Sequence, residues 1–286
     1  MKKLSIFCLL AALFLTPVTV FAQVDAPSGP VDPAEIEPFV DGIMAATMDN
    51  YHVPGTIVVI VKDGEVLFAK GYGYSDVEKK IPVDPATTLF RPGSVSKLFT
   101  WTAVMQLVEQ GKLDLNTDIN EYLDFDIPTT YDKPITLTQI LTHTPGFEDN
   151  GQHLFSIEQE NAISNETYVK TYIPARVYEP GTVGAYSNYA TALAGYIVER
   201  VAEIPFEEYI NDNILSPLGM SLSTFRQPLP SNLTNNMSGG YNYIEGEWVQ
   251  GPFENVNGSP TGALSASGLD MAKFMIAHLQ NGEYQG

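Results

Sequence analysis

The chain has 286 residues, 44% of them hydrophobic, which supports one large domain or two interlocked subdomains and excludes a disordered or fibrous protein. Its formal net charge of −19 disfavours nucleic acid and anionic lipid as general partners, and we interpret it as a solvated acidic surface. The single cysteine, Cys8, lies in the N-terminal signal described next, so disulfides and thiol nucleophiles are excluded from the mature protein.

Residues 1–22 have the features of a secretory signal. Two lysines precede an apolar run that extends to Leu15, and the segment ends in Ala22, a small residue suited to cleavage. The sequence therefore predicts an exported protein, periplasmic or secreted, whose mature chain begins near Gln23 and has a charge of −21 once the two lysines are removed. An uncleaved membrane anchor is the alternative, which Pro17 disfavours because it interrupts the apolar stretch.

The first elements predicted in the mature chain are a helix and a β-hairpin. Asp32 is placed as the N-cap of a helix that runs to Asn50, with Pro33 in its first turn. A β-branched strand over 56–61 and a return strand over 66–72 follow, joined by the strong turn signal Asp63-Gly64. The helix is expected to pack against this antiparallel pair.

From Thr87 onward the pattern changes to helical segments separated by loops rich in proline and glycine. Helices are predicted over Ser94–Gln110, Thr138–Leu141, Tyr189–Glu203, Phe206–Leu215 and Ser267–Leu279. We therefore expect one domain over 23–286, in which residues 23–86 form part of a sheet subdomain and residues from about 87 to 260 form a helical subdomain.

Ser94 and Lys97 are candidate catalytic residues at the start of the first of these helices. Three residues place them about one helical turn apart, close enough for the amine to take the hydroxyl proton. Free backbone N–H groups at a helix start favour a developing anion, and Gly93 leaves room for a substrate. The rest of the helix is apolar on most of its circumference, which predicts burial. Alternatively, Ser94 caps the helix and Lys97 lies on the surface, since Ser-x-x-Lys arises about once by chance in such a length.

Tyr186 and Asn188 are a second pair of candidates, in the loop before the helix near Tyr189. Alternate residues of an extended segment point the same way. A phenol beside an amine can shuttle protons, and a carboxamide can bind a substrate carbonyl and N–H group. These are the groups that amide or ester cleavage needs. The alternative is a tyrosine packed in a turn and an asparagine that caps the next helix.

Together the two motifs, Ser94-Val95-Ser96-Lys97 and Tyr186-Ser187-Asn188, resemble those of the penicillin-recognising serine hydrolases, nearest to the branch of class C β-lactamases, DD-peptidases and esterases. The further stretches that match are Ile135–Phe147, Pro217–Met220 and Gly262–Ser267. The resemblance covers nearly the whole mature chain and implies a β-lactamase/transpeptidase-like α/β (α+β) fold. In that fold an antiparallel sheet subdomain, built from both chain ends, flanks an inserted helical subdomain.

The same resemblance implies covalent acyl-enzyme hydrolysis of an amide, β-lactam or ester carbonyl, with Ser94 as nucleophile, Lys97 and Tyr186 as proton-transfer groups and Asn188 as a substrate-binding residue. The partner implied is a small-molecule or peptide substrate with an acyl carbonyl. Two questions stay open at this point. Either Lys97 or Tyr186 can be the general base, and β-lactams, D-alanyl peptides and short esters all fit the motifs.

One departure from the family pattern is the third motif, a Lys- or His-containing triplet ending in glycine, which nothing after Asn188 fits. A turn at Asn281-Gly282 is followed by Gly286, where another strand is expected, so we expect the domain to be C-terminally incomplete and residues 1–286 alone to be inactive. A binding homologue or sensor that captures ligand without turnover is the alternative function. An α/β-hydrolase is rejected because the sequence has no Gly-x-Ser-x-Gly elbow.

The remaining polar candidates are assigned structural roles. His143, in His-Thr-Pro-Gly, is interpreted as a residue that fixes a loop, and Glu166 as a carboxylate on a surface loop instead of a catalytic base. The other histidines share no metal-ligand spacing, so neither a metal nor a cofactor is predicted. Membrane attachment is expected only through an uncleaved signal or a segment beyond Gly286.

Overall fold

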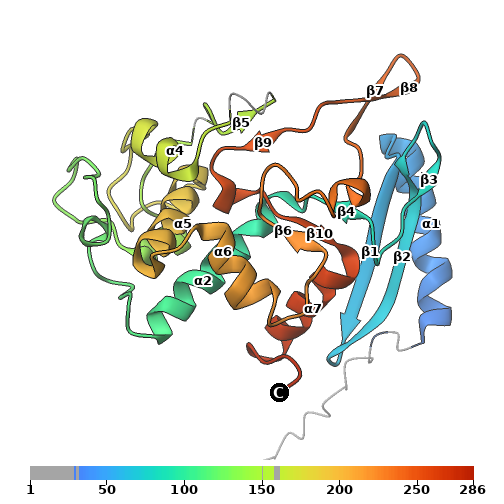
Figure 1. Ribbon diagram of the computed structural model, residues 1–286, viewed down its shortest axis with the longest axis horizontal. Coiled ribbons are helices and arrows are strands. Elements are labelled where there is room, and N and C mark those ends of the chain that lie inside the picture. The colour runs from blue at the N-terminus through green and yellow to red at the C-terminus, as the bar shows by residue number, and fades with distance from the viewer. Residues whose placement is uncertain (1–28, 30–31, 150, 158–161) are drawn as a thin grey trace, which may run out of the picture.

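In the computed structural model, which describes residues 29, 32–149, 151–157 and 162–286, an antiparallel sheet stands between two helices from distant parts of the sequence (Figure 1). The predicted signal over 1–22 lies outside the described residues. Within the described part of the chain, no helix is both long and apolar enough to cross a membrane.

The predicted N-terminal helix and hairpin are confirmed. Helix α1 spans Pro33–Tyr51, and the Asp32 side chain caps it by accepting a hydrogen bond from the Ala34 N–H at 2.8 Å. Strands β1 (Gly55–Lys62) and β2 (Glu65–Asp76) form the antiparallel pair, and the short strand β3 (Ile81–Pro82) adds to the far edge of β2. Apolar side chains of α1 and β2 pack together as a small separate core, composed of Ile36, Val40 and Phe68.

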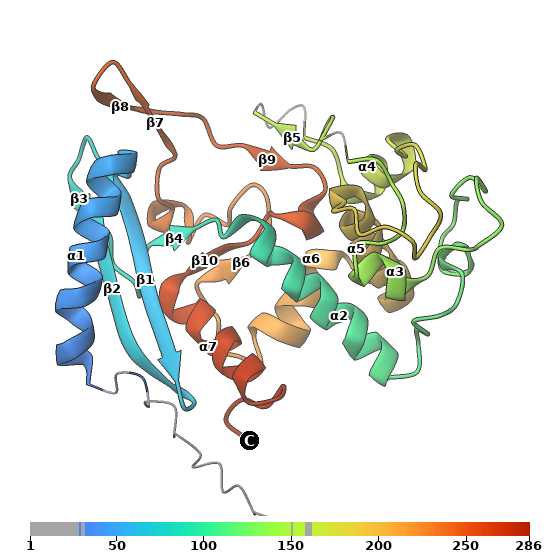
Figure 2. The same ribbon diagram turned by 180° about the vertical axis from the view of Figure 1, so that it is seen from behind.

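The other face of the sheet is covered by helix α7, Gly268–Leu279, which packs against β1 (Figures 1 and 2). Ser267 caps this helix, as a side-chain oxygen at the N-cap position does, by accepting from the Asp270 N–H at 3.2 Å. Gly268 allows the close approach because a Cβ at this position would come within 2.6 Å of the Ile57 side chain. A helix from the C-terminal part of the sequence thus packs on a sheet whose three strands all come from the N-terminal part.

The helical part of the fold is centred on α5, Asn188–Ala202, whose side chains are all buried from Tyr189 to Val198. Helix α2, Lys97–Glu109, packs along it, and Phe99, Val104 and Leu107 of α2 are fully buried in the shared core. The other helices are α3 (Leu137–Leu141), α4 (Asn165–Thr171) and α6 (Phe206–Ile210), which continues as a π-helical turn over Asn211–Leu215. Figure 2 shows α2 running across this half of the molecule beside α6 and α5.

Among the described residues, seven further short strands lie outside the main sheet, and the sequence pattern did not predict them. Strand β10 lies between β4 and β6 in a small antiparallel sheet, and two further pairs are β5 with β9 and β7 with β8. Their bounds are Leu89–Phe90 (β4), Phe155–Ser156 (β5), Ser223–Thr224 (β6), Tyr241–Ile244 (β7), Glu247–Gln250 (β8), Asn255–Val256 (β9) and Ser265–Ser267 (β10). Two to four residues are too few for an alternating pattern to be recognised.

Two details of the α2 region differ from the prediction. The segment Gly93–Ser96 is a 3₁₀ turn, so the α-helix proper begins at Lys97 instead of Ser94. One face of α2 is also not buried: Leu98 and Met105 are 43% and 45% exposed and line an apolar groove of about 680 Å³ together with Phe274 of α7. The sequence predicted that this helix is buried, because it is apolar on most of its circumference. No described residues cover the face that carries Leu98 and Met105.

The packing of α5 gives a first testable prediction. Gly195 faces the 3₁₀ turn Ser259–Thr261, and a Cβ at this position would overlap the ring of Pro260. We expect Gly195→Ala to lower the free energy of unfolding by about 1–3 kcal/mol, because overpacking a close contact displaces backbone. Denaturant unfolding measures this.

Gly42→Ala is the matched control for this prediction. Gly42 lies in α1, and a Cβ added there would meet no described atom within 4 Å, so alanine should raise stability by about 0.5–1 kcal/mol through its better helix propensity. Equal stabilisation by both substitutions would contradict the close contact between α5 and the turn.

Candidate active site

Ser94 lies in an open position on the 3₁₀ turn that leads into α2. The turn starts at Gly93, which has a positive φ of 57° and open space around it, so the backbone beside Ser94 is accessible. Ser94 itself is exposed, and no hydrogen bond from a described side chain caps this turn, which removes the interpretation of Ser94 as a helix cap. Its Oγ atom accepts hydrogen bonds from the side chains of Lys97 and Tyr186.

Lys97 is buried, with only 4% of the residue exposed, so the interpretation of Lys97 as a surface lysine is wrong. Its Nζ atom donates to Ser94 Oγ at 3.2 Å, to Asn188 Oδ1 at 2.9 Å and to the Thr261 carbonyl at 2.9 Å. An ammonium has three donors, so these three acceptors satisfy the charged form completely. A buried charge is tolerated only when it is paired or hydrogen-bonded in this way.

Tyr186 and Asn188 reach Lys97 from the start of α5, on alternate residues as predicted. The Tyr186 hydroxyl donates to Ser94 Oγ at 2.7 Å, and Lys97 Nζ lies 4.8 Å from the centre of the Tyr186 ring. Between them, Ser187 points into the protein and caps α5 by accepting from the Ala190 N–H at 3.1 Å. The cap is therefore Ser187, and the Asn188 side chain is left to contact Lys97.

Two further residues complete the site, and sequence reasoning missed both. Thr261 contributes only its backbone carbonyl, which no residue type can signal. Asp149 accepts from Asn188 Nδ2 at 3.1 Å and from the Asn188 backbone N–H at 3.3 Å. Thr261 directly precedes the family-like stretch 262–267, and Asp149 follows the stretch 135–147 by two residues. This proximity to stretches that resemble the family was the signal that could have identified both residues.

His143 holds the loop that carries Tyr186, which agrees with its interpretation as a loop-fixing residue. Its backbone carbonyl accepts from the Ala185 N–H at 2.8 Å, and its Nδ1 faces the Ser187 N–H at 3.4 Å. The imidazole ring packs 4.5 Å from the ring of Tyr186, measured between centres. Burial, with a further contribution from the charge of Lys97, lowers the pKa of His143 below its usual value, which favours the neutral ring.

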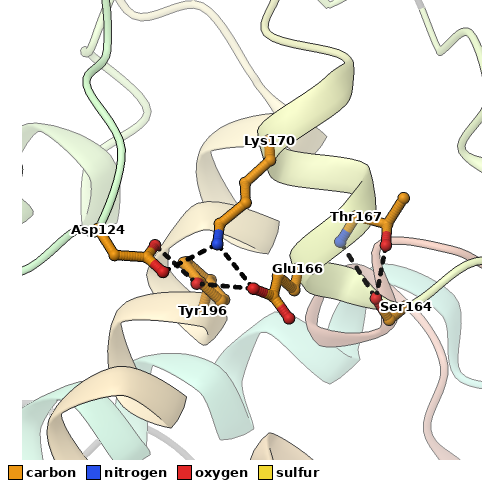
Figure 3. A network of polar contacts seen from close by, with 6 residues as sticks. All are labelled: Asp124, Ser164, Glu166, Thr167, Lys170 and Tyr196. Carbon is orange, nitrogen blue, oxygen red and sulfur yellow. Dashed lines mark hydrogen bonds and ion pairs between the residues drawn. The ribbon is translucent and has the colours of Figure 1, made fainter.

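Glu166 belongs to a different network, on α4 and α5 (Figure 3). Lys170 forms ion pairs with Glu166 at 2.6 Å and with Asp124 at 2.8 Å, and the Tyr196 hydroxyl donates to Asp124 at 2.8 Å. Hydrogen bonds to the two carboxylates hold the pKa of Lys170 well above its usual range. Glu166 thus lies in the first turn of α4 and not in the predicted loop, and it is engaged in an ion pair away from Ser94.

The protons of the Ser94 cluster determine what it can do. With Lys97 as an ammonium and Tyr186 as a phenol, both groups donate to Ser94 Oγ and neither can accept its proton. Loss of one proton from either group turns that group into an acceptor within hydrogen-bonding distance of the hydroxyl. The cluster can therefore activate a serine nucleophile with either residue as the base. The described residues contain no group of three or more His, Cys, Asp or Glu side chains placed to hold a metal ion.

Comparisons with known proteins give a consistent result. A family model described as Beta-lactamase matches residues 40–286. Protein flp of Staphylococcus aureus (strain N315) is 31% identical over 208 residues, which cover 70% of this chain and 39% of that protein. PbpX of Bacillus subtilis (strain 168) is 33% identical over 178 residues, covering 60% of this chain and 43% of PbpX. The chain thus spans less than half the length of either relative.

A solved structure shows the same fold. It is that of an octameric penicillin-binding protein homologue from Pyrococcus abyssi, which superposes with a TM-score of 0.74 at 30% sequence identity. The match covers 86% of this chain and 57% of that one. The mixed fold of antiparallel strands and helices that the sequence predicted is therefore confirmed.

The neutral state of His143 gives a prediction for pH dependence. Folding lowers the pKa of the His143 imidazole below its usual value of 6.5, so as the pH falls the unfolded chain is protonated at His143 before the folded protein is. Protonation therefore favours the unfolded chain, and the folded protein loses stability as the pH falls below about 6.5. We expect the free energy of unfolding to fall more between pH 7.5 and pH 5.5 in the wild type than in His143→Asn. Asparagine is chosen because it tolerates the φ of 53° at this position. Identical pH dependence in the two proteins, measured by denaturant unfolding, would contradict the assignment.

Proposed function

The chain belongs to the beta-lactamase family, whose members are serine hydrolases, and we propose that it cleaves an amide, β-lactam or ester carbonyl through an acyl-enzyme formed on Ser94. The proposal is supported chiefly by two contacts of Ser94 Oγ: Lys97 Nζ lies 3.2 Å from it, and the Tyr186 hydroxyl lies 2.7 Å from it. A nucleophile and base within hydrogen-bonding distance, with the base held by further groups, are the signature of covalent catalysis.

In the proposed reaction, the deprotonated member of the Lys97–Tyr186 pair takes the Ser94 hydroxyl proton as Oγ attacks the substrate carbonyl carbon. The new Oγ–C bond converts the carbonyl oxygen into an oxyanion, whose negative charge the positive N-terminal end of the α2 dipole favours. When the bond to the leaving group breaks, the leaving group receives the proton that the base had taken. Water then adds to the acyl carbon, and Ser94 regains its proton as the acid product departs.

Lys97 and Tyr186 are suited to different parts of this cycle. Lys97 is buried and anchored to Asn188 and Thr261, so it can gain or lose a proton without moving. Tyr186 is 46% exposed, which gives its hydroxyl access to a leaving group or to water. The arrangement supports a proton path from Ser94 through these two side chains to the leaving group.

Acylation tests the proposal directly. The protein should gain the mass of one acyl group when treated with p-nitrophenyl butyrate, and Ser94→Ala should gain none. Lys97→Ala should slow acylation by about 10²- to 10⁴-fold, the range for loss of a general base. Intact-mass measurements over time provide the rates.

Lys112→Ala is the matched control, because Lys112 is an exposed lysine just beyond α2 and its loss removes the same charge. It should acylate at the wild-type rate. Acylation of Ser94→Ala at that rate, or an equal effect of the two lysine substitutions, would contradict the proposal.

Turnover separates a hydrolase from a homologue that only captures its ligand. We expect release of p-nitrophenol to continue well past one equivalent per protein, because water and Tyr186 both have access to the acyl group. Stopped-flow absorbance at excess ester makes this measurement. A burst of one equivalent followed by no further release would instead assign the protein to non-turnover binding.

A further inference from the structure

The carboxylate of Asp149 touches the proposed site without belonging to the nucleophile cluster. Its two oxygens accept from both nitrogen atoms of Asn188, from Nδ2 at 3.1 Å and from the backbone N–H at 3.3 Å. The backbone N–H belongs to the first residue of α5, where the helix dipole favours a negative charge. Asp149 is nevertheless exposed, so a molecule bound over Asn188 also meets this carboxylate.

The loop that carries Asp149 is fixed immediately before it. Phe147 is 1% exposed, and Glu148 donates its backbone N–H to the Ala175 carbonyl at 2.9 Å. Gly146 packs against the backbone of Tyr178 with no room for a Cβ and has a φ of 83°. The backbone that leads into Asp149 is therefore held in place by contacts of the preceding residues.

Asp149 and Lys97 together permit only one orientation of the Asn188 amide. Asn188 Oδ1 accepts from Lys97 Nζ at 2.9 Å on one side, and Nδ2 donates to Asp149 on the other. A flipped amide would place Nδ2 against the ammonium and Oδ1 against the carboxylate, so both contacts would become repulsive. One N–H of Nδ2 and one lone pair of Oδ1 then remain for a substrate.

Among the described residues, no cation forms an ion pair with the Asp149 carboxylate. Lys97 lies behind Asn188 and its three donors are all occupied. Arg176 pairs with Phe147 through the backbone, and its guanidinium lies 5.2 Å from the Phe147 ring with Nε and one terminal nitrogen buried. A substrate group placed over Asn188 therefore meets a negative charge on the solvent side.

We infer that Asp149 orients Asn188 and, through its charge, makes the site select substrates with a cationic or N–H-donating group over Asn188 against substrates with a carboxylate there. This inference rests on the proposed function and specifies its substrate class. Asp149 acts as a positioning and specificity residue, since the bonds that form and break are all at Ser94 and the substrate carbonyl.

Two substrate series test the selection. In the first, p-nitrophenyl esters carry an ammonium, neutral or carboxylate acyl group of equal length. In the second, butyryl thioesters carry the same three charges on the thiol leaving group. The wild type should acylate about tenfold faster with the cationic than with the anionic member of at least one series, in keeping with one charge a few ångströms away in a wet site. The series that shows the preference reports which part of the substrate lies over Asn188.

The matched variants isolate the charge. Asp149→Asn keeps an oxygen that can accept from Asn188 but removes the charge, so the cationic-to-anionic rate ratio should fall to near one. Asp149→Glu keeps the negative charge and should therefore keep much of the wild-type cationic-to-anionic rate ratio. Asp132→Asn removes the same charge from an exposed position elsewhere and should leave the ratio at the wild-type value. Because each ratio is taken within one variant, a general loss of activity or folded protein cancels.

The inference is overturned if Asp149→Asn leaves the ratio unchanged in both series. If no ester labels the wild type at Ser94, the proposed function is wrong.

The charge selection is then tested by NMR, with glycinamide as the cationic ligand and N-acetylglycine as the anionic ligand. In the wild type, glycinamide should shift the Asn188 side-chain amide resonance at a lower concentration than N-acetylglycine does. This difference should vanish in Asp149→Asn. Equal titrations by the two ligands in the wild type would also overturn the inference.

Discussion

The structure depends on one interaction: a buried ammonium that must find three acceptors. Lys97 is 4% exposed, and the transfer of an unpaired charge into a protein interior is too unfavourable for a marginally stable fold. Its acceptors come from three segments, the turn at Ser94, the start of α5 at Asn188 and the turn at Thr261. Folding around Lys97 therefore assembles the nucleophile cluster at the same time.

Two of these segments, the start of α2 and the chain around Thr261, are also joined by contacts that involve no charge. Thr100 donates to the Pro260 carbonyl at 2.8 Å, and Ser96 donates to the Gly93 carbonyl at 2.6 Å while accepting from the Leu264 N–H at 3.3 Å. These buried hydroxyls tie the start of α2 to the chain around Thr261. The nucleophile thus stands on a rigid support, and its exposed side faces solvent, where a substrate can approach.

The sequence predicted what local pattern encodes and missed what only the fold creates. The capped helix α1 and the Asp63-Gly64 hairpin were predicted because their signals are short-range, and the convergence of Ser94, Lys97, Tyr186 and Asn188 followed from two motifs in family order. The Thr261 carbonyl carries no residue-type signal, and Asp149 resembles any loop aspartate until its contact with Asn188 is seen. The exposed face of α2 was predicted to be buried because apolar character does not reveal whether a partner covers it.

We propose that this cluster makes Ser94, and no other serine, a nucleophile. Ser96 provides an internal comparison, because it lies two residues away but is fully buried and hydrogen-bonded to backbone. The most direct measurement is tandem mass spectrometry of peptides from protein briefly treated with an activated ester, which localises the acyl group. We expect an acyl group on Ser94 alone. An acyl group on Ser96 or on an unrelated hydroxyl, with Ser94 unmodified, would contradict it.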